Sequence, residues 1–318
     1  MRRTSIKPKR IYELAQEYLS DNKIIVSHPY GGRPRDYDDA LIITIACIQN
    51  LHQFSFREAL EFCEDIFPEL PTLSTYHYRL SKISSKVARG FVAYLGKKIQ
   101  SQKSLSRGIS FFITDGTGFS FHDLYPMKFH RGLEIRKIKA HVKAAVLAGV
   151  FGKKRRFIIS ANTGPPYTGD TTLARPLIKN LEPSRGYLIG DKGFDSHEIM
   201  ALGLDRGLKP AIAVKQGRLH QNINDPLRLR SKKNADNPRI YKKRTLVEGL
   251  FGNIKQKLSS HVRIFRLNIA ETFVLLRFAL FNMSVLVSLE NQEIIWRWFS
   301  NSPRASFPFP LGVKKNRN

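Results

Sequence analysis

The stretch from Ile109 to Thr163 decides the fold class, because three runs rich in apolar and β-branched residues follow one another in it. They read ISFFITD (109–115), KIKAHVKAAVLAGVF (137–151) and RRFIISANT (155–163). This composition predicts three strands that can pair as consecutive neighbours. Downstream, helix and strand patterns alternate: DTTLARPLIKNL (170–181), GYLIG (186–190), HEIMALGLDRG (197–207) and LKPAIAV (208–214). The order predicts an α/β fold with a mixed sheet flanked by helices.

The first hundred residues have a different pattern, with apolar residues at helical spacing and few strand signals. Five segments are expected to be helices: IYELAQEYL (11–19), DDALIITIACIQNLH (38–52), SFREALEFCEDIF (55–67), STYHYRLSKI (74–83) and KVARGFVAYLGKKI (86–99). We therefore expect three parts in the chain. A helical domain spans residues 1–104, the strand-rich domain spans 105–292, and a tail spans 293–318, rich in Pro and charge from Ser302 onward.

The segment PELPTLS (68–74) joins two of the expected helices, with Ser74 as a candidate N-cap for the second. That second helix carries polar and aromatic residues: Tyr76, His77, Tyr78, Arg79 and Lys82. Two interpretations stay open. The pair is a helix-turn-helix that places these side chains in a DNA groove, or it is an ordinary part of a helical bundle. The connecting segment is longer than the usual turn of 3–4 residues.

The chain is strongly basic, with 53 Lys and Arg against 26 Asp and Glu and a formal net charge of +27. A partner rich in negative charge is the simplest explanation, and nucleic acid is the leading candidate, although a basic ribosome-associated protein would look similar. Two basic stretches fit a DNA path. Ten Lys or Arg lie between Lys128 and Arg156, with Glu134 as the one acid. The second stretch lies between Arg218 and Lys243 and contains Arg228, Arg230, Lys232, Lys233 and Arg239. It is expected to be a polar loop that clamps a DNA backbone, and the alternative is an ordinary solvated basic loop.

The remaining composition indicates an intracellular protein, expected in the cytoplasm and associated with the nucleoid. Cys47 and Cys63 form no metal-binding pattern and are expected to be reduced core residues. The apolar stretch from Ile269 to Leu289 contains Glu271, Arg277 and Asn282, which favours a buried helix over a membrane span.

The segment YKKRTLVEGLFGNIK (241–255) places four chemically active side chains at intervals of three, four and seven residues. Tyr241, Arg244, Glu248 and Lys255 would therefore share one edge of a helix, within about 60° at about 100° per residue. Apolar residues occupy most of the other side, so one face can pack while the other does chemistry. The same charges would also suit a solvated, ion-paired helix face.

Two further carboxylates come at the ends of expected strands. Asp115 ends ISFFITD and Asp191 ends YLIGD. Each alone is compatible with an ordinary turn residue. If the fold brings Asp115 and Asp191 together with Glu248, the three carboxylates would repel one another, and a hard cation such as Mg²⁺ would relieve that repulsion. Two such ions promote in-line displacement at a phosphodiester without a protein nucleophile.

Residues 107–290 resemble the DDE transposases of prokaryotic insertion sequences, whose last catalytic motif reads Y-x2-R-x3-E-x6-K. All four signature positions match, at Tyr241, Arg244, Glu248 and Lys255. The resemblance implies an RNase H-like catalytic domain in which Asp115, Asp191 and Glu248 are the catalytic acids and bind two Mg²⁺ ions, with Mn²⁺ as a possible substitute. It also implies phosphate contacts by Arg244 and Lys255, and a terminal nucleotide held by Tyr241.

The implied activity is metal-dependent cleavage of double-stranded DNA at transposon ends, followed by transfer of the 3′-OH into target DNA by a homodimer assembled on DNA. Two positions depart from the family pattern: Gly116, where relatives often have Ser, and Phe194, where many have Tyr. The 57 residues from Asp191 to Glu248 leave no room for the large strand-rich insertion of some members. The alternatives are a nuclease or resolvase that cuts without joining, and a catalytically silent DNA-binding protein.

Overall fold

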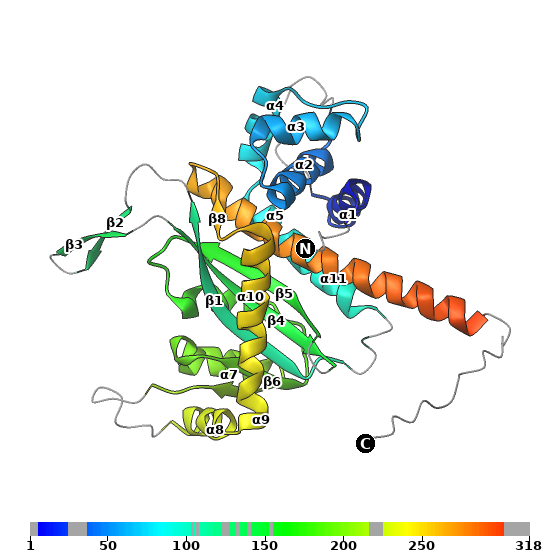
Figure 1. Ribbon diagram of the computed structural model, residues 1–318. Coiled ribbons are helices and arrows are strands. Elements are labelled where there is room, and N and C mark those ends of the chain that lie inside the picture. The colour runs from blue at the N-terminus through cyan, green and yellow to red at the C-terminus, as the bar shows by residue number, and fades with distance from the viewer. Residues whose placement is uncertain are drawn as a thin grey trace, which may run out of the picture.

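In this computed structural model, a mixed sheet lies at the centre of the molecule and helices surround it (Figure 1). The structure describes residues 6–24, 37–102, 105, 108–121, 127–131, 134–138, 141–152, 155–215 and 225–301, with the backbone alone for 127–138 and 292–301. The helices of the N-terminal region are α1 (Pro8–Asp21), α2 (Asp39–His52), α3 (Phe56–Glu64), α4 (Leu73–Lys82) and α5 (Ser85–Gln100). The later helices are α6 (Asp170–Lys179), α7 (His197–Asp205), α8 (Pro226–Ala235), α9 (Pro238–Tyr241), α10 (Thr245–Leu258) and α11 (Leu267–Asn301). The strands are β1 (Phe111–Phe121), β2 (Met127–Arg131), β3 (Glu134–Ile138), β4 (His141–Phe151), β5 (Arg155–Gly164), β6 (Gly186–Gly190), β7 (Leu208–Ile212) and β8 (His261–Val262).

The main sheet has the strand order β5-β4-β1-β6-β7, and the short β8 pairs with the end of β1. β4 is antiparallel to both β1 and β5, whereas β6 runs parallel to β1 and to β7. This is the RNase H-like mixed sheet that the sequence predicted. One expected strand is divided, because β3 ends at Ile138 and pairs with β2 in a separate hairpin, while β4 begins at His141. The hairpin extends away from the main sheet (Figure 1).

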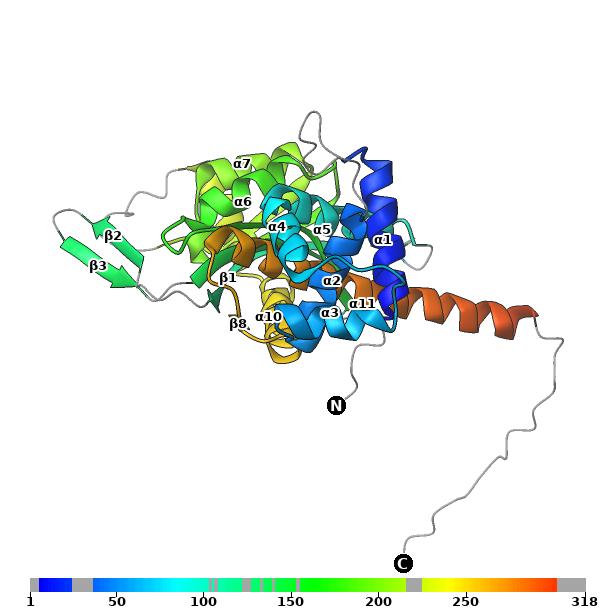
Figure 2. The same ribbon diagram turned by 90° about the horizontal axis from the view of Figure 1, so that it is seen from above.

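Helices cover both faces of the sheet. α6 and α7 lie on one side and α10 on the other (Figure 2). α11 packs against β5, α5 and α2, so it joins the sheet to the N-terminal helices. This long helix confirms the buried helix predicted around Ile269–Leu289. By length and composition Leu267–Asn291 could cross a membrane, but 72% of its most apolar window is buried in this protein, as expected of a core helix.

Local sequence signals start the N-terminal helices. Asp38 and Ser84 each accept a hydrogen bond from a backbone N–H three residues on, at the starts of α2 and α5. Ser55 and Glu58 form a reciprocal capping box at the start of α3. Cys47 and Cys63 are buried free thiols, in agreement with the prediction that they are core residues.

In the candidate helix-turn-helix, the N-cap of the second helix, α4, lies two residues earlier than predicted, because Thr72 and not Ser74 caps it. Two of its polar residues serve the helical bundle. The buried Tyr76 hydroxyl donates to Gln49 Oε1 at 2.8 Å, and Arg79 donates to the Asp39 carboxylate on α2 at 2.5 Å. Tyr78 is 60% exposed. The bundle interpretation therefore accounts for Tyr76 and Arg79.

Candidate active site

Asp115 lies inside β1, whereas the sequence predicts it at a strand end. The apolar run stops at Asp115, but β1 keeps β4 as its partner as far as the pair Ser120–His141 and so continues to Phe121. Its other neighbour, β6, pairs only with Phe111–Ile113. Asp115 therefore lies just beyond the end of β6, where that edge of β1 is no longer covered by a paired strand.

Asp191 reaches the same level from the neighbouring strand. The last parallel pair joins Ile113 to Ile189, so Asp115 and Asp191 each lie two residues farther along. Adjacent strands are about 4.8 Å apart, which brings the two positions close together. Each carboxylate is held by a backbone N–H: Asp115 accepts from Gly116 and Asp191 from Gly193, both at 2.8 Å.

The segment predicted as one helix from Tyr241 to Lys255 consists of three consecutive helical pieces. α9 ends at Tyr241, a 3₁₀ turn spans Lys242–Arg244, and α10 continues from Thr245. Arg244 has helical backbone angles, so the chain keeps its direction into α10. The core-facing stripe of α10 includes the buried residues Val247, Leu250, Phe251, Ile254 and Leu258.

Arg244 joins this helix to β1. One guanidinium nitrogen lies 2.5 Å from Glu248 Oε1, and the other lies 3.9 Å from Asp115 Oδ2. The Asp115 side chain is only 13% exposed, whereas that of Glu248 is 48% exposed. The polar edge of the helix therefore faces the strand that carries Asp115, and the guanidinium acts as the counter-charge between two carboxylates.

Burial and the charges of the other two acids both act on the carboxyl of Asp115. Burial is the largest effect on Asp115 and raises the pKa of its carboxyl to about 6, opposed by the Gly116 N–H and by Arg244. The charges of Asp191 and Glu248 raise that pKa further. The same three acids also raise the pKa of the Tyr241 hydroxyl, for which burial is the largest cause.

Lys255 lies on the same edge of α10, with its ammonium 5.3 Å from the centre of the Phe119 ring. Burial lowers the pKa of Lys255, and the ring face offers it a cation–π contact. The structure thus brings Tyr241, Arg244, Glu248 and Lys255 to the side of β1.

The described part of the second basic stretch is helical and not the loop that the sequence predicts, since Arg228, Arg230, Lys232 and Lys233 lie in α8 and Arg239 lies in α9. Asp225 caps α8 by accepting from Leu227 N, and Pro226 occupies the first helical position. Asp-Pro before a run without Gly is a helix-start signal that the sequence interpretation overlooked. The buried Ser231 hydroxyl donates to Ile212 O and accepts from Ile212 N, which fixes α8 to β7.

The four predicted DNA-binding residues of α8 differ in their surroundings. Arg228 makes a bidentate contact with the nearly buried Asp195, at 3.0 and 2.7 Å, so its guanidinium is committed to holding the loop after Asp191. Arg230 and Lys233 are exposed and Lys232 is half-buried. Of the other basic stretch, the side chains of 128–139 lie outside the described residues.

Comparison with known families decides the classification. Residues 106–283 match the family model described as the transposase DDE domain. The chain belongs to this family.

The DDE-domain protein also resembles an uncharacterized protein of Aquifex aeolicus (strain VF5), with 30% identity over 260 residues, covering 81% of this chain and 80% of the relative. Among solved structures it is similar to the piggyBac transposase in a synaptic complex with hairpin DNA. That similarity covers 92% of this chain and 77% of the other at 9% identity, with a TM-score of 0.43.

A fourth carboxylate, which the sequence analysis did not identify, lies beside the first two. A Cβ at Gly193 would lie 2.9 Å from Asp191 Oδ1 and 3.1 Å from Asp170 Oδ2, so both carboxylates border the same small space. A Cβ at Gly116 would lie 3.1 Å from Asp170 Oδ1. Asp170 opens α6, where a negative charge suits the helix dipole, and pairs with Lys143 of β4 at 2.9 Å.

The structure shows the environments of Gly116 and Phe194, the two positions that depart from the family pattern. Gly116 leaves room for the Asp170 carboxylate, which a Ser side chain would crowd. Phe194 is fully buried, so the ring at this position packs in the core. No sequence signal could place Asp170, because the contact depends on how α6 docks against β1.

The donor chemistry of this candidate site fits a hard divalent cation, because all its candidate ligands are carboxylates and two of them raise the pKa of Asp115. Within the described residues, no three Asp, Glu, His or Cys side chains are gathered closely enough to hold a metal ion. Arg244 instead supplies the positive charge between Asp115 and Glu248. Glu248 is the most exposed of the three acids.

Proposed function

We propose that this protein is a Mg²⁺-dependent transposase that cleaves DNA at the ends of its element and joins the freed 3′-hydroxyl to target DNA. One observation carries the proposal: Asp115 and Asp191 lie at the same level of two neighbouring parallel strands, and Arg244 links Asp115 to the helix-borne Glu248. This arrangement supplies acids from three different elements around one open strand edge.

The ionised carboxylates of Asp115, Asp191 and Glu248 would hold the ions. Two divalent ions at such a site supply Lewis-acid activation of the attacking and leaving oxygens during in-line displacement at phosphorus. The fold contributes positioning, because the Gly116 and Gly193 amides hold the two Asp carboxylates in place.

Arg244 pairs with two of the carboxylates that would hold the ions, and with the ions bound its guanidinium would be available to bind a phosphate of the DNA. Lys255 and Tyr241 lie on the same helix edge and would contact the same strand. We propose duplex DNA as the partner, since the net charge of +27 favours release of counterions from phosphates.

A cleavage and joining assay tests the proposal. The substrate is a supercoiled plasmid that carries two copies of the DNA flanking the gene, incubated with wild-type protein and Mg²⁺ or with EDTA. We expect Mg²⁺-dependent cuts and joined products. Asp191→Ala should abolish both while DNA affinity is retained or increased, because a negative charge near phosphate is removed. Asp205→Ala, at the exposed end of α7, is the control.

The other outcomes separate the alternatives. Cuts without joined products would identify a nuclease or resolvase. DNA binding without cuts in Mg²⁺ or Mn²⁺ would identify a silent DNA-binding protein. Full cleavage by Asp191→Ala would remove Asp191 from the active site.

A further inference from the structure

In the middle of α10 the exposed face has a bare strip formed by Gly249 and Gly252, and the exposed Thr245 and Gln256 lie on the same face before and after it. Gly249 and Gly252 are both exposed in the middle of this helix, and nothing lies within 4 Å of a Cβ built at Gly252. Glycine weakens a helix interior because it loses more conformational freedom than other residues. Its usual benefit is that another molecule can approach the backbone closely.

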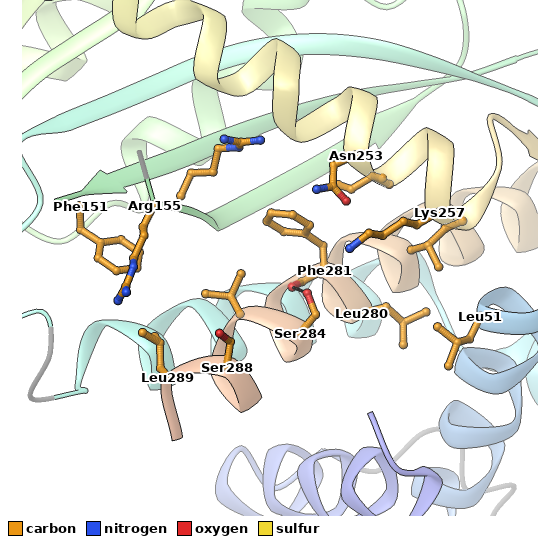
Figure 3. A pocket seen from close by; sticks show the side chains of 14 residues that line it. Leu51, Phe151, Arg155, Asn253, Lys257, Leu280, Phe281, Ser284, Ser288 and Leu289 are labelled. Carbon is orange, nitrogen blue, oxygen red and sulfur yellow. Dashed lines mark hydrogen bonds between the residues drawn. The ribbon is translucent and has the colours of Figure 1, made fainter. Parts of the chain in front are cut away.

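The far edge of this bare strip borders a pocket between α10, α11 and β5 (Figure 3). The pocket has a volume of about 350 Å³. Asn253 and Lys257 of α10 lie above it, and Phe281 and Ser284 of α11 lie below (Figure 3). Its charged lining residues are Arg155, Arg156 and Lys257, and none of the described residues that line it is acidic.

Arg156 is a half-buried cation in the lining of this pocket. Its Nε is buried and has no hydrogen-bond partner among the described residues. Burial lowers the pKa of Arg156. One terminal nitrogen lies 3.3 Å from the position of a Cβ at Gly249, so the guanidinium lies against the bare strip of α10. An anion at the half-buried Arg156 guanidinium would supply a charge-assisted hydrogen bond to this unsatisfied Nε.

Helix geometry relates this pocket to the proposed active site. From Glu248 to Lys257 the helix turns by about 180° and rises by about 14 Å. Gly252 and Gly249 lie on the solvent side between these two edges. A rise of about 14 Å corresponds to about four nucleotides of a duplex strand at about 3.4 Å each.

We propose that one DNA strand crosses the glycine face of α10, with its reacting end at Glu248 and a phosphate farther along bound by Arg156 and Lys257. This inference rests on the proposed function, since it takes DNA as the ligand. The phosphate site lies on the opposite edge of the helix from the family signature residues. Asn253 and Ser284 supply neutral hydrogen-bonding groups at the same place.

Salt-dependent DNA binding tests the phosphate site. The probe is a short fluorescein-labelled duplex, and anisotropy gives the affinity at several salt concentrations. Arg156→Gln and Lys257→Gln should each weaken binding and reduce the slope of log affinity against log salt by about 0.9. Lys179→Gln is the control, because it removes the same charge from an exposed residue of α6, on the other side of the sheet from α10. It should leave the slope unchanged. Equal slopes for all three variants would overturn the proposal.

Substitutions at Gly252 test the crossing without a loss of folding. Gly252→Ala should raise Tm, because the helix gains propensity and its methyl group meets no neighbour. Gly252→Leu should also keep a stable helix but should weaken DNA binding at least tenfold, because its side chain blocks the strand. Unchanged affinity of Gly252→Leu would rule the crossing out. A wild-type protein that binds no DNA would instead overturn the proposed function itself.

Discussion

Asp115 carries a charge that the folded protein accommodates poorly without a cation. Its pKa rises to about 6 on folding from about 3.9 in an unfolded chain. Between these values the folded state binds the proton more tightly, so the stability contributed by this group is present at pH 4 and is lost as pH rises through 6. Asp115→Asn should therefore stabilise the metal-free protein at pH 7 by about 1–2 kcal/mol, with no difference at pH 4.

Thermal unfolding at the two pH values, in the presence of EDTA, measures this effect. Mg²⁺ should raise the Tm of wild type more than that of Asp115→Asn, because the variant lacks one of the three proposed ligands. A lower Tm for Asp115→Asn than for wild type at pH 7 would contradict the argument.

Asp170 should strengthen cation binding although it lies outside the three-acid pattern. Its carboxylate borders the same space as Asp191, and its charge adds to the negative potential there. Asp170→Asn should weaken Mn²⁺ binding several-fold by isothermal titration calorimetry, whereas Asp205→Asn should not. Wild-type Mn²⁺ affinity in Asp170→Asn would show that Asp170 only holds Lys143.

Among the secondary-structure elements, α11 fixes the C-terminal end of α10 through the side chain of Arg277. The buried guanidinium donates to Ser259 O and His261 O at 2.9 Å and to Asn50 Oδ1 at 3.0 Å. Ser259 has a φ of 71°, so the chain turns sharply there at the end of α10. Arg277→Ala would leave these acceptors unpaired in the interior.

We expect Arg277→Ala to lower the free energy of unfolding by about 3 kcal/mol in urea titrations. Hydrogen exchange should also accelerate in the last turn of α10. The exposed Arg266→Ala serves as the control. If exchange in α10 stays at the wild-type rate while stability falls, Arg277 supports α11 alone.

The elements themselves were largely predictable, because hydrophobic period and capping residues act over a few positions. The mixed sheet and the pairing of its first three main strands were predicted from three consecutive strands followed by alternating helices and strands, whereas the full strand order came from the structure. The extension of β1 past Asp115 was not predictable, since pairing with β4 sustains the strand where its own residues turn polar. The partners of Arg277 were also hidden, because two of them are backbone carbonyls, which sequence patterns do not mark.

The same distinction applies to the candidate site. Asp115, Asp191 and Glu248 could be selected as candidates from the sequence, because a spaced motif and two acids after apolar runs leave a local signal. The sequence analysis did not predict the helix α8, although Asp225 and Pro226 are an N-cap and a first-turn proline that indicate a helix start. The commitment of Arg228 to Asp195 depends on tertiary docking and left no local signal.

At the scale of the whole molecule, α11 binds the N-terminal helices and the sheet into one unit. The fully buried Asn282 side chain donates to Val92 O of α5 and Ile158 O of β5, and accepts from Ile158 N. Thr272 donates to Ile83 O, just after α4. Unfolding of the N-terminal helices or of the sheet alone would leave these buried polar groups without hydrogen-bond partners. This cost opposes independent unfolding of either part.

We therefore predict that the division near residue 104 marks a change of architecture within one cooperative unit. Hydrogen exchange followed by mass spectrometry should give the same opening free energy for amides of α5 and of β4, equal to the global value from urea. Asn282→Leu fills the space without the amide and should lower both values together. If α5 instead opens at a markedly lower free energy than β4 in wild type, the helical region is an autonomous domain that docks on the sheet, and α11 then serves as its hinge.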